Sequence, residues 1–388
     1  MRVLIAVPRL AMPGGVSNYY TALRHYLDAQ KVYFEVGGVP GETGRWRKLR
    51  RLLIDYWRFH RRLSTERFDL VHLNPSMDLP SVFRDGVLVL IARLHRRSLL
   101  VFYRGWIPSA EAHVRRYHQR LFRWVYGQAD ANLVLAESFR RTLAVMGVRL
   151  PTFIETTVVD DAVLAAAAEA TRINAPPRPP GKPCRILYLA RLDVGKGLPE
   201  AIDAFARLQQ LWPAVSLTVA GDGRERAAAE LDVRRRGLVN VSFLGHVTGN
   251  AKARAFTEAD IYLFTSRAEG MPNSVLEAMA SGLPIVTRLV GGICDFFEDG
   301  RMGYATEGSN ASDYTELLAR LVRNPGLCKS IGRYNQEFAR RHFAASVVAA
   351  RLLAIYVQVG VSLRRPKRLV PRSYLESVAV GPVRRRWR

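Results

Sequence analysis

Short runs of apolar residues alternate along this chain with longer segments in which apolar residues recur every three or four positions. In the first half, apolar runs at residues 3–7, 70–73, 99–103, 131–135 and 152–155 predict strands, and the segments between them predict helices. Strands that alternate with helices are typical of a parallel sheet with helices on both faces. The first half is therefore predicted to be an α/β domain that binds ligands at the carboxyl ends of its strands.

The second half repeats this alternation after a proline-rich segment at residues 176–183. Proline removes backbone donors and stops helices, so we expect a stiff connection there. The predicted strands are 185–190, 216–220, 241–244 and 261–264, and the predicted helices are 198–211, 225–236, 312–323, 327–340 and 343–359. The predicted organisation is a first domain at 1–165, a linker at 166–183, a second domain at 184–342, a helix at 343–360 and a tail at 361–388.

Length and charge narrow the classes of protein. A chain of 388 residues exceeds the size at which one hydrophobic core keeps growing, which favours two domains. The net charge of +24 implies attraction to nucleic acid, anionic lipid or a phosphorylated substrate. No apolar run approaches the roughly 18 residues of a membrane span, the first run is too short for a signal peptide, and the cysteines lack disulfide or metal-ligand spacing. We expect a cytoplasmic protein.

Residues 45–63 combine an apolar stripe with many arginines. Trp46, Trp57 and Phe59 add aromatic tips to this predicted helix, and most arginines lie off the stripe. Such a helix either lies on an anionic membrane surface or buries its stripe in an ordinary core. Together with a basic tail at 361–388, it favours attachment to the inner face of the cytoplasmic membrane. The residues of the stripe are Leu49, Leu52, Leu53, Tyr56, His60 and Leu63.

Loops that follow predicted strands carry residues suited to anions. Gly14 and Gly15 follow the first strand and open a helix, which lets the backbone approach an oxyanion closely. Arg104 follows the strand at 99–103, and Arg191 and Lys196 follow the strand that begins the second domain. Two cations in a glycine-containing turn can pair with the oxygens of a diphosphate. A plain strand-to-helix turn and ordinary surface cations remain open alternatives.

The stretch 266–286 reads as loop, helix, turn and buried strand. Glu269 lies in the loop, and the helix is predicted to begin near Asn273 or Ser274, so that its unpaired N–H groups favour an anion. Ser274 and Glu277 also have the spacing of a capping box. A phosphate at the helix end with a polyol beside Glu269, and a plain helix cap, both remain open on the residues alone.

Two motifs carry a resemblance to a known family. The run Glu-Gly-Met-Pro-Asn-Ser-Val-Leu-Glu at 269–277, with Gly291-Gly292 after it, resembles the Glu-x7-Glu region of the retaining GT-B glycosyltransferases of the GT4 or glycosyl transferases group 1 family. The run Ala-Arg-Leu-Asp-x-x-Lys-Gly at 190–197 resembles the phosphate-binding segment of that family. The resemblance implies a GT-B fold, in which two Rossmann-like doubly wound parallel-sheet α/β domains face each other across a cleft.

The resemblance also implies the roles of individual residues. Arg191 and Lys196 would stabilise a departing diphosphate, Glu269 would hold sugar hydroxyls, and Glu277 would hold the ribose. The family carries a histidine where this chain has Arg104; arginine cannot act as a general base, so its expected role is to hold a phosphate or an acceptor hydroxyl. The expected catalytic residues are Glu269, Arg191, Lys196 and Arg104, and the expected donor site is Gly14, Gly15, Arg191, Lys196, His246, Glu269, Gly270, Met271, Asn273, Ser274, Val275 and Glu277.

The expected reaction moves a hexosyl group from a nucleotide-sugar to an acceptor hydroxyl with retention. No Asp-x-Asp motif follows a first-half strand, and cations can neutralise the diphosphate, so neither a metal nor another cofactor is expected. The basic helix and tail favour a lipid-linked or cell-surface polysaccharide or lipopolysaccharide precursor as acceptor. A soluble acceptor and a catalytically silent sugar-nucleotide-binding module are the alternatives. No nucleic-acid partner is expected, because the basic residues form no known reading motif.

Overall fold

The computed structural model divides the chain into two compact units. Unit 1 holds residues 1–157 together with the segment that begins at Ala345, and unit 2 holds Val158–Ala344. The division falls ahead of the boundary expected at 165, because helix α7 (Asp161–Glu169) packs within unit 2. The described residues are 1–12, 14–27, 30–39, 42–159, 161–169 and 183–362, so most of the expected linker and nearly all of the expected tail lie outside them.

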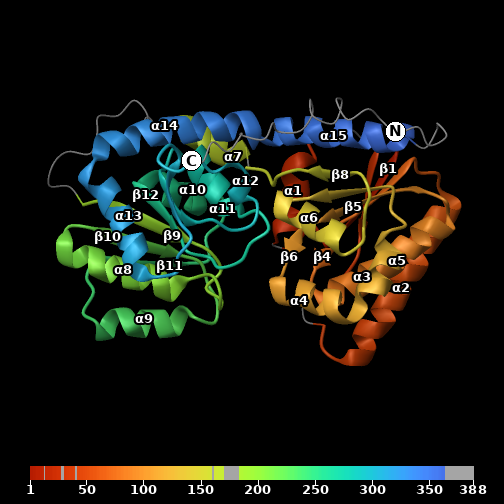
Figure 1. Ribbon diagram of the computed structural model, residues 1–388, viewed down its shortest axis with the longest axis horizontal. Coiled ribbons are helices and arrows are strands. Elements are labelled where there is room, and N and C mark those ends of the chain that lie inside the picture. The colour runs from red at the N-terminus through yellow and green to blue at the C-terminus, as the bar shows by residue number, and fades with distance from the viewer. Residues whose placement is uncertain (13, 28–29, 40–41, 160, 170–182, 363–388) are drawn as a thin grey trace. The chain divides into compact units, whose positions relative to one another are not determined.

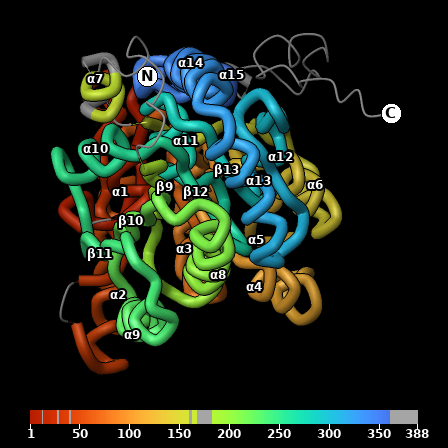
Figure 2. Tube along the Cα trace, turned by 90° about the vertical axis from the view of Figure 1, so that its left-hand side faces the viewer, coloured from red at the N-terminus to blue at the C-terminus, as the bar shows by residue number. Residues whose placement is uncertain are grey.

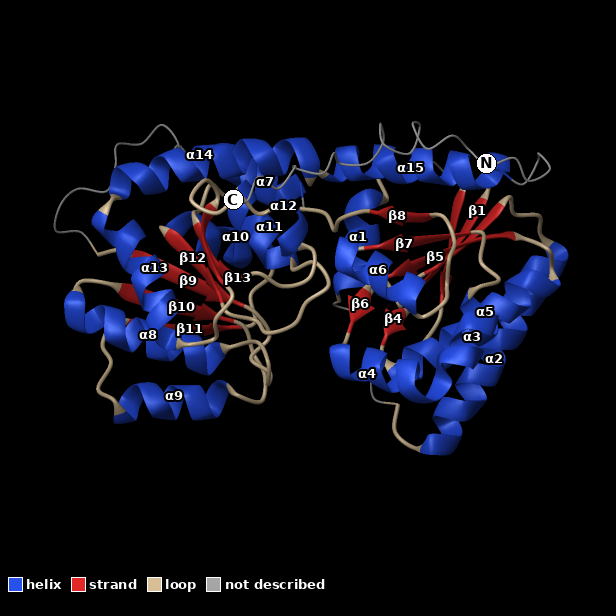
Figure 3. Ribbon diagram, viewed as in Figure 1, coloured by secondary structure: helices blue, strands red, loops and turns tan. Residues whose placement is uncertain are grey.

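Unit 1 is built on a six-stranded parallel sheet in the order β2-β1-β3-β5-β7-β8 (Figures 1 and 3). The chain passes from β1 to β2 and then returns to β3 on the other side of β1, so the strand order reverses there. Ligands of open parallel sheets bind outside the carboxyl ends of the strands near such a reversal. The strands are β1 (Val3–Val7), β2 (Lys31–Glu35), β3 (Leu70–Leu73), β5 (Ser98–Tyr103), β7 (Ala131–Val134) and β8 (Thr152–Ile154).

Helices form two layers on this sheet. The helices α2 (Arg45–Thr65), α3 (Leu79–Leu94) and α5 (Gln119–Tyr126) pack in one layer. The helices α1 (Gly15–Leu23) and α15 (Ala345–Ser362) pack together, and α15 also contacts β3 and β5. Right-handed crossovers in opposite directions along the sheet account for the two layers. The remaining helices of the unit are α4 (Pro108–His113), a π-helical turn at Val114–His118, and α6 (Glu137–Val145).

A buried histidine connects α15 to the sheet of unit 1. The Nδ1 atom of His72, on β3, lies 2.7 Å from the hydroxyl of Tyr356, and its Nε2 atom lies 3.4 Å from the hydroxyl of Tyr20. Burial, assisted by the charge of Arg104, lowers the pKa of His72 to about 3. The imidazole is therefore neutral near pH 7, where it serves as a hydrogen-bonding member of the core.

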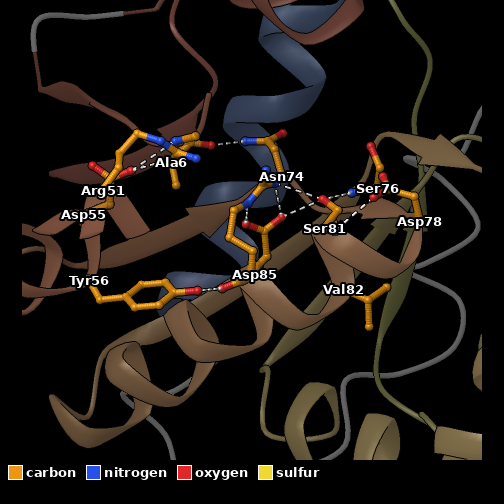
Figure 4. A network of polar contacts seen from close by, with 12 residues as sticks. Ala6, Arg51, Asp55, Tyr56, Asn74, Ser76, Asp78, Ser81, Val82 and Asp85 are labelled. Carbon is orange, nitrogen blue, oxygen red and sulfur yellow. Dashed lines mark hydrogen bonds and ion pairs between the residues drawn. The ribbon is translucent and has the colours of Figure 1, made fainter. Parts of the chain in front are cut away.

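A polar network ties the start of α3 to a short additional pair of strands, β4 (Ser76–Met77) and β6 (Gly105–Trp106). The carboxylate of Asp78 caps α3 by accepting from the Ser81 backbone N–H at 2.9 Å. The Ser81 hydroxyl accepts from the Ser76 N–H at 3.1 Å and donates to Asp85 at 3.0 Å (Figure 4). Because Ser76 pairs with Gly105, this network holds the segment that follows β5.

Unit 2 has a second six-stranded parallel sheet, in the order β11-β10-β9-β12-β13-β14. Consecutive residues of β9 point to different cores: Ile186 and Tyr188 belong to one hydrophobic cluster and Leu187 to the other. Strands buried on both faces read as continuous apolar runs, which is how they were recognised in the sequence. The strands are β9 (Arg185–Leu189), β10 (Ser216–Ala220), β11 (Val241–Gly245), β12 (Ile261–Phe264), β13 (Ile285–Arg288) and β14 (Gly303–Thr306).

Helices cover both faces of the unit 2 sheet, and α8 and α13 lie side by side on one of them (Figure 2). The helix α7 contacts α10 and α11. The helices are α8 (Leu198–Leu211), α9 (Arg226–Arg235), α10 (Gly249–Glu258), α11 (Asn273–Ala280), α12 (Ile293–Phe296), α13 (Ala311–Arg323) and α14 (Pro325–His342).

The buried face of helix α2 coincides only in part with the predicted apolar stripe. Phe59, expected as an exposed aromatic tip, is fully buried against Phe34 at a ring distance of 5.2 Å. Leu49 and Leu53 belong to the stripe that was expected either on a membrane surface or in the core, and they are exposed, whereas Leu63 of the same stripe is fully buried. The predicted stripe was set by spacing alone, whereas the buried face includes Asp55, a charged residue that spacing of apolar positions cannot identify.

Candidate functional site

Two residues predicted from separate motifs meet in unit 2. The strand order reverses between β9 and β12, the place where open α/β sheets bind their ligands. Lys196 lies in the loop after β9 and Glu269 in the loop after β12. The Lys196 Nζ atom lies 2.6 Å from Glu269 Oε1, and each side chain is 19% exposed. A cation and a carboxylate are thus held, partly open to solvent, at the ligand-binding edge of the sheet.

Hydrogen bonds to backbone carbonyls hold the two loops against each other. The Arg267 N–H donates to the Gly195 carbonyl at 2.9 Å, and the Thr265 hydroxyl donates to the Gly197 carbonyl at 2.7 Å. Gly197 has φ +80°, and a Cβ there would lie 2.3 Å from the Thr265 carbonyl oxygen. Glycine is therefore required for this approach. The Ser266 hydroxyl donates to Glu269 Oε1 at 2.9 Å and orients the carboxylate.

Gly291 and Gly292 clamp the loop that carries Glu269. The Gly292 N–H donates to the Gly270 carbonyl at 2.7 Å. Gly291 has φ +53°, and a Cβ there would lie 2.3 Å from the Glu269 carbonyl oxygen and 2.4 Å from that of Gly270. Any larger residue at 291 would push the Glu269 loop out of position, which gives this part of the motif a physical reason.

Helix α11 begins at Asn273, as predicted, but without the capping box that Ser274 and Glu277 suggested. Its N-cap residue is Pro272, and no side chain of the described residues makes a capping hydrogen bond there. The Glu277 carboxylate is instead bonded to Lys252 of α10, with Nζ 2.6 Å from Oε1. The helix N-terminus therefore keeps backbone donors that no side chain caps.

Lys252 was missed by sequence reasoning. It stands 25 residues before Glu277, and no motif links the two positions. Packing of α10 beside the β12–β13 crossover brings them together, so only the fold reveals this pair. The result is a second partly buried lysine–glutamate contact in unit 2, on the helix that starts directly after the Glu269 loop.

The other predicted residues of unit 2 differ in exposure and place. Arg191 follows β9, but its side chain is 76% exposed and lies 3.3 Å from Asp193. His246 is exposed and follows β11, which is separated from β9 by β10. Met271 is half-buried and Val275 fully buried. Gly270 and the start of α11 at Asn273–Val275 adjoin Glu269 in the chain.

Three predicted residues lie in unit 1. Gly14 and Gly15 are exposed at the start of α1, where Gly14 is the N-cap without a side-chain hydrogen bond. Arg104 is buried after β5, with its guanidinium carbon 3.9 Å from the ring centroid of Tyr19. Across the described ranges, no cluster of three or more His, Cys, Asp or Glu side chains is arranged to hold a metal ion.

Two Rossmann-like parallel-sheet units define the fold class as GT-B, and solved structures agree. Sucrose-phosphate synthase from Thermosynechococcus elongatus superposes with a TM-score of 0.73 at 17% identity, covering 93% of this chain and all of that one. The HepE protein of Anabaena, solved with UDP and glucose, gives a TM-score of 0.69 at 16% identity over 92% of this chain and 99% of that one. At such identities the likeness concerns the fold.

Sequence comparison gives the family. The family described as "Glycosyl transferases group 1" matches residues 170–338, and the "Glycosyl transferase 4-like domain" matches residues 7–152. The chain belongs to the glycosyl transferases group 1 family. Glycogen synthase of Mycobacterium tuberculosis is 24% identical over 69% of this chain, and phosphatidyl-myo-inositol mannosyltransferase of Mycobacterium leprae is 29% identical over 46%. These matches span 63% and 47% of the lengths of the two relatives.

Proposed function

We propose that this protein is a retaining, metal-independent glycosyltransferase that uses a nucleotide-sugar. It moves a hexosyl group to a hydroxyl of a lipid-linked or cell-surface polysaccharide precursor at the inner face of the cytoplasmic membrane. The observation that carries the proposal is the contact of Lys196 with Glu269 at the strand-order reversal of unit 2. Family membership supports the proposal, and so does the structure of the Anabaena protein of the same fold, which was solved in complex with UDP and glucose.

The residues fit the charge changes of the reaction. Negative charge collects on the diphosphate as the bond to the sugar breaks, and Lys196, Arg191 and the N–H groups at the start of α11 offer positive charge to it. When the donor binds, its phosphate replaces Glu269 as the partner of Lys196. The Glu269 carboxylate, still oriented by Ser266, then accepts hydrogen bonds from sugar hydroxyls.

Glu277 and Lys252 suit a second part of the donor. A carboxylate can accept hydrogen bonds from both hydroxyls of a ribose, and Lys252 keeps the Glu277 carboxylate in place through the 2.6 Å contact. With cations supplying the neutralisation, the reaction needs no divalent ion. In the retaining reaction, the proton of the acceptor hydroxyl passes to the departing phosphate.

An exposed apolar face on α2 supports the membrane part of the proposal. Trp46 is 83% exposed and Trp57 is 58% exposed, and Leu49, Leu53 and Ile54 are exposed between them at helical spacing. Exposed arginines at positions 47, 50, 58 and 61 accompany this face. An exposed helix that combines aromatic and basic residues fits an anionic membrane surface.

A groove beside α2 adds to this surface. Its volume is about 650 Å³, and α2 contributes Trp57 and three arginines to it. Arg61 lies over the Trp57 ring at 5.4 Å. A groove with cations and an aromatic wall suits a phosphate-bearing lipid headgroup. Its lining residues are Tyr33, Phe34, Glu35, Trp57, Arg58, Arg61, Arg62 and Thr65. Among the described helices, none is long and apolar enough to cross a bilayer.

The donor site is tested by thermal unfolding of the purified protein with UDP-, GDP-, ADP- and TDP-sugars, each with and without EDTA. We expect one nucleotide class to raise the melting temperature, because a ligand that binds only the folded state stabilises it. The increase should persist in EDTA. No increase with any donor would contradict the proposal, whereas an increase abolished by EDTA would contradict metal independence.

The membrane surface is tested by replacing Trp46 and Trp57 together with serine. We expect binding to vesicles that contain anionic lipid to weaken about tenfold or more, because two large apolar side chains that would insert into the lipid surface are removed. Co-sedimentation measures the affinity. A matched variant, Leu211→Ser with Val239→Ser, removes two exposed apolar residues of unit 2 and should bind like the unmodified protein. Equal binding by all three proteins would contradict attachment through α2.

A further inference from the structure

Arg104 occupies a position that the surrounding backbone holds firmly. Its N–H donates to the Pro75 carbonyl at 2.9 Å, and the next residue, Gly105, pairs with Ser76 in the β4–β6 ladder. A Cβ at Gly105 would lie 2.8 Å from the Ser76 hydroxyl oxygen, so the close approach needs glycine. Ser76 is in turn bonded to Ser81 in the polar network at the start of α3 (Figure 4). The fold therefore holds the backbone of Arg104 in place at the carboxyl end of β5.

The guanidinium of Arg104 is buried without an acceptor for much of its hydrogen-bonding capacity. The residue is 8% exposed, and its guanidinium carbon lies 3.9 Å from the Tyr19 ring centroid and 4.5 Å from that of Phe102. Neither Nε nor Nη1 has a hydrogen-bond partner among the described residues. Buried polar groups are ordinarily paired, so these two donors call for an explanation.

The carboxylate of Glu155 is close enough to Arg104 for their charges to interact, but it is hydrogen-bonded to other residues. Glu155, directly after β8, accepts from Arg351 of α15 through Nη2 at 2.6 Å and Nε at 2.9 Å. It also accepts from the Thr156 N–H at 2.8 Å. Within the described part of the chain, two arginines thus share one carboxylate, which leaves the positive charge of Arg104 without a bonded counter-charge. Burial lowers the pKa of the Arg104 guanidinium, consistent with a cation that lacks a bonded counter-charge.

The ring stacking explains only part of this arrangement. The faces of Tyr19 and Phe102 attract the cation but accept no hydrogen bond in the guanidinium plane. The hydroxyls of Thr156 and Thr157, which follow Glu155 in the chain, are likewise buried without a partner among the described residues. Several unsatisfied donors therefore gather at the carboxyl ends of the unit 1 strands, the edge at which such sheets bind ligands.

We propose that Arg104 binds an oxyanion carried by the acceptor, a phosphate or a carboxylate group, and so selects anionic acceptors. This inference rests on the proposed glycosyl transfer and adds the chemical class of the acceptor. The planar guanidinium fork matches the geometry of both oxyanions, and the aromatic rings hold its plane. A neutral sugar would leave the excess charge of the site unpaired.

The test measures the affinity of the full chain for glucose 6-phosphate, glucuronate and glucose by titration calorimetry at constant ionic strength. Arg104→Gln is expected to weaken binding of the anionic probes about tenfold or more and to leave glucose binding unchanged. The matched control is Arg97→Gln. Arg97 precedes β5 as Arg104 follows it, and its Nε is likewise buried without a partner among the described residues, but it lies at the opposite end of the strand.

The comparison of probes identifies the source of the oxyanion. Loss confined to glucose 6-phosphate supports a phosphate-bearing acceptor, and loss confined to glucuronate supports a uronate. Equal losses in Arg104→Gln and Arg97→Gln would overturn the proposal, because the chain is basic enough to bind anions without a specific site. If Arg104→Gln does not fold, Arg104→Lys keeps the charge without the fork, and unchanged affinity for both anionic probes would overturn the proposal.

Donor binding separates this inference from the proposed function. UDP-sugar or another effective donor should stabilise Arg104→Gln as much as the unmodified protein, because Lys196, Glu269 and Glu277, which are proposed to hold the donor, lie in unit 2. A loss of donor stabilisation equal to the loss of anion binding would overturn the assignment to the acceptor. Absence of donor stabilisation in the unmodified protein would count against the proposed function while leaving the anion measurement valid.

Discussion

Replacing Glu269 with glutamine is expected to reduce sugar transfer at least about a hundredfold while the protein stays folded. The carboxylate offers acceptors on both oxygens, whereas an amide offers one oxygen and presents an NH2 group that cannot accept. The amide also removes the charge opposite Lys196, which lies 2.6 Å away, and weakens the contact that positions both loops. Steady-state turnover with the effective donor and thermal unfolding together measure the two parts of this expectation.

The control for this change is Glu200→Gln. Glu200, at the start of α8, accepts a hydrogen bond from Arg267, two residues before Glu269 in the same loop. Its loss removes a carboxylate that contacts that loop from α8 without touching the Lys196–Glu269 contact, so turnover should stay within a few-fold of the unmodified enzyme. Full activity in Glu269→Gln would refute the assignment of the active site. Equal losses in both variants would indicate a general effect on the loop.

The sequence predicted most elements of unit 2 because they are regular and buried, although it missed the helices α10 and α12. Helix α8 and strand β10 have the predicted bounds, and α11 begins where its first turn was placed. Their apolar positions face two cores, which makes the pattern strong. The strands β2 and β14 were missed, because both are edge strands whose residues are largely half-buried and whose pattern is correspondingly weak.

The individual residues of the site were easier to find than their contacts. Lys196 and Glu269 each belong to a recognisable motif, but only the fold brings them together across 73 positions. Glu155 and Arg351 are 196 positions apart and carry no motif. The capping box at Ser274 failed for the same reason, since Lys252 arrives from another helix to bind Glu277. The spacing of residues within a short segment cannot predict that a residue far away in the sequence will bind one of its side chains.

Removing the cation is the second change with a large expected effect. In Lys196→Met, transfer should fall about a hundredfold to a thousandfold, because the departing diphosphate loses a preorganised positive charge. The donor should also bind more weakly, so that kcat falls and KM rises together. The lysine is suited to this role because it is partly buried and fixed by Glu269, and a charge in such a site is screened less than one in open solvent.

Arg191→Met provides the contrast that makes this prediction specific. Arg191 follows the same strand, but its side chain is 76% exposed and is shared with Asp193 at 3.3 Å. An exposed charge is screened by solvent and salt, and its long side chain must be ordered when the donor binds. We therefore expect a smaller loss than in Lys196→Met, and one that shrinks as salt concentration rises. A larger loss in Arg191→Met than in Lys196→Met would contradict this prediction. It would mean that Arg191 is the main cation that binds the leaving diphosphate, and that the contact of Lys196 with Glu269 serves to hold the two loops together.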